Sequence, residues 1–393
     1  MFDVNVLCYP WDLEDEGVEN VLDCVQGELG VDGITVLVAG RPLTQLRRRR
    51  QVAPRVFRTR GGLFFQPDQS KYRSTRLKPV VSGWLKARNP LATIAHACRK
   101  RDIQLRAVLH TRRIGRLAAR FTSCATKSPF GDHSPGLICQ HNPDVAEFLR
   151  ALVNDLSENY PLAAIVLRDL GRPFDTDLLD VLEPAPALGS AGRELLAVCF
   201  CESCIQAAGA AGIDTDAVVE FVQRTMSQAI EAGHPLADTL NEQLSKSQPL
   251  EDYIRNRSAA HGAFVETLPG RATCELALHM TTDGIFAASE NSGLSPRWDM
   301  LVVEAGPPAS PEGGGILRFI DGWNHAAAQF RVEAQIPGYD PAAPDGTTLV
   351  KALDHLARSR FSGVILDHYG IMAHPEFTAA KQAIRYATRT TRT

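Results

Sequence analysis

Eight short apolar runs, separated by amphipathic or polar segments, are the feature of this sequence that most limits how the chain can fold. They cover residues 3–10, 33–40, 103–111, 162–171, 272–280, 297–306, 330–338 and 362–370. Runs that are apolar almost throughout are typical of strands buried on both faces of a parallel sheet. Helical patterns stand between many of them, as in "NPLATIAHACRKRD" before the third run. Eight strands that alternate with helices predict an α/β fold, a closed (β/α)8 TIM barrel.

Two segments are longer than the loops of a barrel need to be. Residues 41–88 follow the second strand and are rich in arginine. Residues 172–270 follow the fourth strand and carry a group of cysteines and at least two helical stretches, near 215–232 and 235–268. No Gly-x-Gly-x-x-Gly motif follows the first strand, which disfavours a doubly wound dinucleotide-binding sheet. We therefore expect a single barrel domain over 1–393, with an arginine-rich loop insert and a helical, cysteine-bearing insertion after strand 4.

The composition of the chain indicates where the protein is located and which partners are not expected. The chain has 393 residues, 44% of them hydrophobic and 22% charged, which is enough to bury a large core. The first residues lack a basic segment followed by an apolar one, and no run approaches the 18 apolar residues of a membrane span. Nine cysteines, an odd number, fit a reducing compartment. These features predict a cytoplasmic protein with no membrane partner. Because the net charge is −3, we also expect no nucleic-acid partner.

The carboxyl ends of the predicted strands are rich in polar and aromatic residues. In a TIM barrel these ends carry the chemistry, because the loops that follow them form the mouth of the barrel. Polar residues beside loops are ordinary one at a time, but their presence at so many strand ends favours a binding site. The candidates for substrate binding at the mouth are Trp11, Asp12, His110, Arg168, His279, Asp367, His368 and Tyr369.

Four cysteines have the spacing of a metal site. Cys199, Cys201 and Cys204 stand within six positions, and Cys139 precedes the helix pattern that leads into the fourth strand. We therefore expect Cys139 and Cys199 to converge beside the loop after that strand. Four thiolates satisfy tetrahedral zinc with no position left for water, so the predicted site is a structural zinc. The alternative is a group of inert buried cysteines.

The order of these motifs resembles a known family. A Cys ahead of Asn-Pro at a helix start, a strand that ends in a short polar motif, and then Cys-x-Cys-x-x-Cys are similar to the zinc-binding region of the glycoside hydrolase family 42 β-galactosidases and related barrel proteins. In that family the polar motif is Asn-Glu-x-Gly, and its Glu is the general acid/base. The matching residues here are Arg168-Asp169-Leu170-Gly171. The resemblance implies a glycosidase acting on a carbohydrate, with Asp169 as proton donor and Arg168 replacing the Asn.

Glycoside hydrolysis needs a second carboxylate, which acts as nucleophile in retaining enzymes and as base in inverting ones. In the family the nucleophile is a Glu at the end of strand seven. Strand seven here, "FRVEAQIPG", has Glu333 inside it and Gln335 at its end. Glu304 ends strand six in "LVVEAG" and needs no partner if it faces the mouth, whereas a buried Glu333 does. We expect Glu304 to be the second catalytic carboxylate and keep Glu333 as the alternative.

Other functions remain open at this point. A catalytically degenerate barrel would keep the zinc and bind sugar without hydrolysing it. A metal-dependent isomerase or hydrolase would use the strand-end histidines with Asp367 or Glu304 as ligands. Residues 41–60 contain eight arginines, and the run Arg47 to Arg50 is either a solvated face or a site for carboxylate, sulfate or phosphate groups. In the second case an anionic sugar becomes a candidate substrate.

Overall fold

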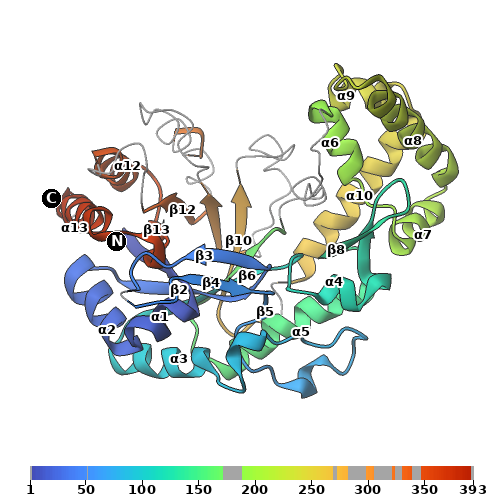
Figure 1. Ribbon diagram of the computed structural model, residues 1–393. Coiled ribbons are helices and arrows are strands. Elements are labelled where there is room, and N and C mark those ends of the chain that lie inside the picture. Colours follow the sequence, from blue (N-terminus) through green and yellow to red (C-terminus); the bar gives the residue numbers. More distant parts are fainter. Residues whose placement is uncertain are drawn as a thin grey trace.

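Eight parallel strands close into a barrel in this computed structural model, which describes residues 2–50, 52–170, 188–268, 272–281, 298–304, 321–323, 330–338 and 347–390 (Figure 1). The strands are β1 (Asp3–Cys8), β2 (Gly33–Gly40), β6 (Gln104–His110), β9 (Ala164–Arg168), β10 (Glu275–Thr281), β11 (Met300–Glu304), β12 (Val332–Pro337) and β13 (Gly363–Asp367). Each pairs with the next, and β13 also pairs with β1. The predicted (β/α)8 TIM barrel is therefore confirmed, and every strand lies within its predicted run except β10, which extends one residue beyond it.

Side chains inside the barrel are stacked in layers, because alternate residues of a strand point to the same side. A middle layer is apolar and fully buried: Leu7, Leu37, Val108, Val166, Ala277, Val302 and Ile365. Two residues further along, the same strands present a polar layer at the mouth: His110, Arg168, His279, Glu304, Gln335 and Asp367. Outward-facing residues pack on the helices and form the largest hydrophobic cluster. The strand period therefore places these residues inside the barrel toward its mouth, with His279 and Gln335 more deeply buried than His110, Glu304 and Asp367.

Helices surround the barrel, as Figure 1 shows. They are α1 (Pro10–Glu16), α2 (Val18–Asp23) with a π-helical continuation (Cys24–Leu29), α3 (Pro90–Lys100), α5 (Pro143–Asn159), α12 (Thr347–Arg358) and α13 (His374–Thr390). Asn89 and Asn142 cap α3 and α5, since their side chains accept hydrogen bonds from backbone N–H groups of the first turn. A proline follows each cap at the first helical position, where no N–H is needed.

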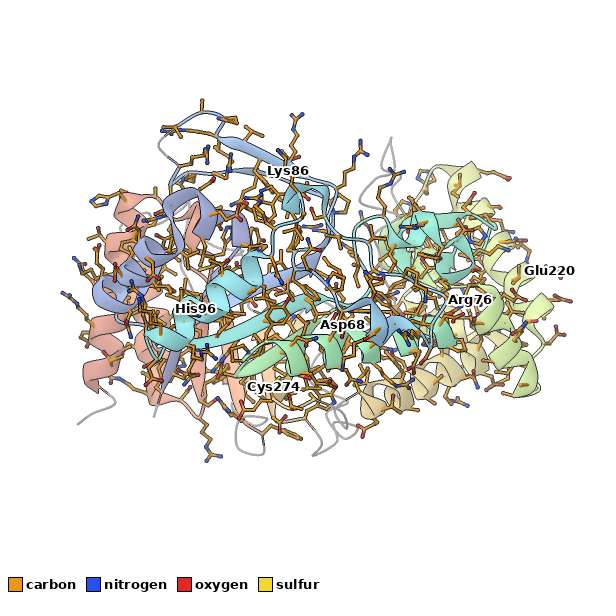
Figure 2. The ribbon with its side chains drawn as sticks, turned by 90° about the horizontal axis from the view of Figure 1, so that it is seen from below. Asp68, Arg76, Lys86, His96, Glu220 and Cys274 are labelled. Atoms are coloured by element: carbon orange, nitrogen blue, oxygen red, sulfur yellow. The ribbon has the colours of Figure 1, made fainter. Side chains whose placement is uncertain are left out.

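The segment after β2 folds over the barrel. Strands β3 (Leu43–Leu46) and β4 (Val56–Thr59) form an antiparallel hairpin, and β5 (Gly62–Leu63) pairs with the end of β2. Further along, Asp68 and Arg76 bring the segment against α5 (Figure 2). The backbone N–H of Asp68 donates to buried Asp155, and Arg76 pairs with Asp144. The segment is thus fastened along its length, with its hairpin next to the mouth.

The segment after β9 adds helices beside the barrel (Figure 1). They are α6 (Gly189–Ala197), α7 (Glu202–Ala210), α8 (Thr215–Ala232), α9 (Leu240–Ser245) and α10 (Gln248–Thr267). They enclose a hydrophobic cluster of their own, next to the α4 helix (Leu117–Arg120) and the β7–β8 hairpin (Ala125–Lys127, His133–Ile138). The stretch predicted as one helix over 235–268 is two, because Ser247 caps a new helix that has a proline in its first turn. No helix among the described residues is long and apolar enough to cross a bilayer.

Candidate active site at the barrel mouth

A cavity of about 480 Å³ opens at the carboxyl ends of the strands, and we call it the mouth pocket. Its walls combine the polar layer of the barrel with residues of the β3–β4 hairpin. The lining residues are Tyr9, Leu37, Arg41, Leu43, Thr44, Gln45, His110, Arg168, Glu304, Gln335, Ile336, Pro337, Asp367, His368 and Ile371. A mostly preformed cavity of this size with a few convergent polar groups is typical of a small-molecule site.

Glu304 is the carboxylate at the centre of the charge network. Arg168 ends β9, which is separated from the Glu304 strand by β10. Its guanidinium donates a hydrogen bond of 2.5 Å from Nη2 to Glu304 Oε2. Burial alone would raise the pKa of Glu304, but the charge and hydrogen bond of Arg168, together with the neighbouring His279 and His110, hold the pKa below its ordinary value. Glu304 is therefore ionised at neutral pH and faces the mouth pocket, as the sequence analysis expects.

A chain of hydrogen bonds joins Glu304 to Asp367 across two strands. The Nε2 atom of His279 lies 3.3 Å from Glu304 Oε2 and 3.2 Å from Gln335 Oε1. The amide nitrogen of Gln335 donates to Asp367 Oδ2 at 3.2 Å. Burial lowers the pKa of His279 to about 3, so its ring is neutral, and its Nε2 carries the hydrogen because both neighbours are acceptors. His279 thus positions the carboxylate rather than offering itself to a substrate.

Asp367 differs from Glu304 in its ionisation. Burial raises the pKa of Asp367 to about 6, and Glu304 adds to the rise, while Arg168 and the Gln335 hydrogen bond oppose it. Its side chain retains 30% exposure and lines the pocket. The mouth pocket therefore holds one carboxyl group, Glu304, that is ionised at neutral pH and a second, Asp367, that takes up a proton as the pH falls toward about 6. Unequal carboxyl groups of this kind mark acid and base roles in glycosidases.

Asp169 is paired with His110, with Asp169 Oδ2 at 2.7 Å from His110 Nδ1. Its backbone has a positive φ of 68°, which is unusual for a residue other than glycine. Burial would raise the pKa of Asp169, but His110, followed by Arg168, outweighs burial and holds the pKa well below its usual range. A proton donor needs the opposite shift. The surroundings of Asp169 thus disagree with the role expected from the resemblance and suit a permanent anion.

Two of the aromatic candidates do not reach the mouth pocket. Trp11 is 1% exposed and stacks on Phe57 of the hairpin, with 4.4 Å between ring centroids. Tyr369 is fully buried, and its hydroxyl donates to Glu16. Neither ring is free to stack on a sugar. Sequence position alone places both at strand ends, but the hairpin covers the first and a helix covers the second.

The pocket wall near β1 is a hydrogen-bonded series that the sequence analysis does not assign. Trp11 Nε1 donates to Gln45 Oε1 at 2.7 Å, so the Gln45 amide nitrogen faces His368 Nε2 at 3.1 Å. The ring of Tyr9 stacks on His368 with 4.2 Å between centroids. Tyr9, Gln45 and Arg41 line the pocket but were not among the predicted binding residues. Asp12 lies behind this wall, 3.7 Å from His368, and is 4% exposed.

Glu333 lies at the opposite end of the barrel interior. It points inward like Gln335 but two residues earlier on β12, so it belongs to the layer at the amino ends of the strands. Its Oε2 accepts a hydrogen bond of 2.5 Å from buried Arg106. Burial raises the pKa of Glu333, and Arg106 opposes that rise. The alternative second carboxylate of the sequence analysis is thus an internal ion pair, separated from the mouth pocket by the apolar layer.

The arginine run makes ion pairs with the barrel. Arg47 and Arg50 both bond to Asp15, and Arg49 bonds to Glu16 at 3.0 Å. Arg48 reaches Glu376 at 3.0 Å. These carboxylates belong to α1 and α13, so the run fastens the hairpin to the barrel instead of offering charge to a ligand. Both interpretations of the sequence analysis, a solvated face and an anion site, miss this role.

The four predicted cysteines come together. Cys139 follows β8, and the other three lie at the start of α7. All four sulfur atoms are buried and lie within 4.8 Å of one another, with 3.5 Å between Cys139 and Cys204 and 3.6 Å between Cys201 and Cys204. None forms a disulfide. The cluster therefore has the donor set and the proximity of a metal site.

Groups around the cluster favour negatively charged sulfur. The backbone N–H groups of Lys127 and Cys201 each donate to Cys199 Sγ at 3.4 Å. The buried guanidinium of Arg257 lies with Nη1 2.6 Å from Cys204 Sγ. Among the described residues, these cysteines are the one group of three or more histidine, cysteine or carboxylate side chains close enough to share a metal ion. Within the described residues, the strand-end histidines therefore do not form a metal-binding group of the kind that a metal-dependent enzyme needs.

Similar folds occur in known glycoside hydrolases. An α-L-fucosidase isoenzyme 2 from Paenibacillus thiaminolyticus matches with a TM-score of 0.58 and 11% identity over 99% of this chain and 49% of its own. A β-galactosidase from the psychrophilic Marinomonas ef1 matches with a TM-score of 0.59 and 11% identity, over 100% of this chain and 60% of its own. A β-galactosidase from the haloarchaeon Halorubrum lacusprofundi matches with a TM-score of 0.55 and 11% identity, over 98% of this chain and 58% of its own.

The chain spans about half to three fifths of the length of these proteins. No protein-family model and no curated protein sequence matches it. At 11% identity the likeness shows the fold alone: this is a TIM barrel of the kind found in glycoside hydrolases, as the sequence resemblance leads one to expect.

Proposed function

We propose that the protein is a glycoside hydrolase that binds a carbohydrate in the mouth pocket. The observation that carries this proposal is the pair of unequal carboxyl groups on its wall: Arg168 lowers the pKa of Glu304, whereas burial raises the pKa of Asp367 to about 6. Hydrolysis of a glycosidic bond needs one carboxylate and one carboxylic acid on the two sides of the scissile bond. Similarity of fold to a fucosidase and to β-galactosidases supports the same class of reaction.

In this proposal Glu304 is the anionic member of the pair. It either attacks the anomeric carbon or removes a proton from the attacking water, and the stereochemistry of the product distinguishes these routes. Arg168 keeps Glu304 charged and oriented through their 2.5 Å hydrogen bond. Asp169 and His110 form a second hydrogen-bonded pair near it, which suits binding of sugar hydroxyls.

Replacing the proposed anion tests the function. Glu304→Gln keeps the size of the side chain but removes its charge, so turnover of aryl glycosides falls by about a thousandfold or more, since nucleophile or base is lost. Glu275→Gln is the matched control, because Glu275 is a surface partner of Arg331 at the amino end of β10. A panel of aryl glycosides and glycuronides shows the result. Turnover that both variants retain equally would contradict the proposal.

A second function has one observation in its favour. Both Glu304 and Asp169 are in direct contact with a partner side chain, Arg168 and His110, which fits a barrel that binds sugar without cleaving it. Titration calorimetry with the same glycosides separates the two functions. Binding by the wild type without turnover of any of them supports the binding barrel.

We also propose that the cysteine cluster holds a structural zinc ion. Four thiolates at about 2.3 Å from zinc have sulfur atoms about 3.8 Å apart, close to the separations of 3.5 and 3.6 Å seen here. When bound, zinc would tie β8 to α7. Arg257 would offset part of the negative charge of a four-thiolate site.

Nine free cysteines further support a cytoplasmic location, where thiols stay reduced.

A further inference from the structure

We propose that Asp367, at the end of β13, is the proton donor of the mouth pocket, in place of Asp169. The inference rests on the proposed function and names the residue that delivers the proton to the leaving group. The sequence analysis places Asp367 among the binding residues only. Three observations carry the reassignment: its position on the pocket wall, its spatial relation to Glu304, and the charges around it.

Asp367 is placed so that one oxygen is held and the other faces the ring of the next residue. Oδ2 accepts the 3.2 Å hydrogen bond from Gln335, while Oδ1 lies 3.8 Å from His368 Nδ1. His368 accepts from Gln45 at Nε2, and burial lowers its pKa to about 3, so it is a neutral ring with its hydrogen on Nδ1. The carboxyl group is oriented by neutral neighbours and still reaches the cavity.

Glu304 and Asp367 end two strands that are separated by β12, and both side chains line the mouth pocket. β11 and β13 are both neighbours of β12, and adjacent strands lie about 4.8 Å apart, so the two backbones are about 10 Å apart. Both side chains point toward the barrel axis, which brings the carboxyl groups nearer to each other, toward the roughly 5–9.5 Å that glycosidases use. Gln335 lies between them and bonds to Asp367 directly and to Glu304 through His279.

The burial of Asp367 and the charged and titratable groups that face it together set its raised pKa. The facing groups are Arg168 from β9, Glu304 from β11, Tyr9 after β1 and the neutral His368. Burial is the strongest influence on Asp367 and raises its pKa to about 6. Arg168 lowers the pKa of Asp367 more than Glu304 raises it, but it does not cancel the effect of burial. Asp169, in contact with His110, has the opposite balance.

The proton transfer balances with the groups present and water. The carboxylic acid of Asp367 gives its proton to the glycosidic oxygen as the bond from that oxygen to the anomeric carbon breaks, and the aglycone leaves as a neutral alcohol. Water supplies the hydroxyl group of the released sugar. Its remaining proton restores Asp367, directly in the retaining route and by way of Glu304 and solvent in the inverting route.

Leaving-group dependence tests this assignment. Asp367→Asn lowers kcat/KM by at least about a hundredfold for glycosides with poor leaving groups, and by less than about tenfold for activated aryl glycosides, which need little protonation. Asp169→Asn is the comparison, and it lowers turnover of both substrate classes by a similar factor. If instead Asp169→Asn shows the selective loss and Asp367→Asn does not, Asp169 is the donor and the inference is wrong.

A measurement on the wild-type protein keeps the test independent of how the variants fold. Carboxyl carbon NMR of labelled protein, with the Asp367 signal assigned by the variant, gives its pKa directly. A value near 6 agrees with a donor, and the activity then falls as the pH rises above that value. A value below about 4.5 overturns the inference, even if the pocket hydrolyses glycosides. A wild type that turns over no glycoside contradicts the proposed function instead.

Discussion

Asp12 and Asp169 carry the same side chain near the same end of the barrel, and their pKa values move in opposite directions. Asp12 is buried behind the pocket wall, and burial raises its pKa to about 7 although the backbone N–H of Tyr9 donates to it. For Asp169, His110 and Arg168 outweigh burial, and the pKa falls. The role of a strand-end carboxyl group is therefore set by neighbours that come from other strands.

Asp12 makes a testable contribution to the pH dependence of stability. Its folded-state pKa lies above the ordinary aspartate value of about 3.9, so unfolding releases a proton between these values. The free energy of unfolding therefore falls as the pH rises through this window, by at most about 1.4 kcal/mol per pH unit. Asp12→Asn keeps an oxygen that accepts from the Tyr9 N–H, but it has no proton to lose, so this part of the decrease in the free energy of unfolding should disappear.

Urea unfolding between about pH 5 and about pH 7 checks the prediction, with the decrease in stability compared between wild type and variant. Asp367 contributes in the same direction in both proteins, so the difference reports on Asp12. Equal decreases in the two proteins would show that Asp12 is ionised throughout and would contradict its assigned pKa.

At the scale of elements, the arginine run is a fastening of the β3–β4 hairpin. Arg49 is its centre, because it bonds to Glu16 and lies over the rings of Tyr369 and Phe377 at 4.3 and 4.8 Å. Arg49→Ala should lower the free energy of unfolding by about 1–3 kcal/mol, from lost ring contacts and an unpaired carboxylate. Arg48→Ala, at a more exposed ion pair, should cost less than about 1 kcal/mol.

Chemical denaturation of the two arginine variants measures this difference, and binding of neutral and anionic sugars provides a second readout. Both variants should change binding of the two sugar classes to the same extent, because the run is paired internally. A selective loss for anionic sugars would restore the anion-site interpretation of the sequence.

The helical insertion offers the test of the zinc proposal. Protein purified without added metal should contain about one zinc per chain, because four thiolates saturate one ion. Cys201→Ser should lose zinc and stability while residual activity per folded molecule stays nearly unchanged, since the cluster is closed and separate from the pocket. Cys98→Ser, at a buried cysteine outside the cluster, should keep its zinc. Less than about a tenth of an equivalent in the wild type would contradict the site.

For the whole molecule, the barrel and the cysteine cluster are predictable from sequence, because both depend on local patterns. Apolar runs with helices between them indicate a barrel, and four cysteines near one strand end indicate a shared ligand set. The mouth is only partly predictable. His110, Arg168 and Glu304 follow from the strand period, but the depth of Glu333 follows from the register between strands, which sequence spacing does not contain.

Long-range packing also explains why the aromatic candidate Trp11 does not line the mouth pocket. Trp11 is covered by Phe57 from a hairpin whose position over the mouth depends on ion pairs with α1 and α13. Gln45 of the same hairpin bonds to Trp11 and lines the pocket. Long-range packing of an insert thus decides which strand-end residues meet a ligand.

The most direct test of a glycosidase at the barrel mouth is proton NMR of a glycoside incubated with the protein in heavy water. The anomeric signal of the released sugar should appear with the wild type, in one configuration first, and should be absent with Glu304→Gln at the same protein concentration. No release by the wild type, while calorimetry still shows that the glycoside binds, would contradict hydrolysis and leave a sugar-binding barrel.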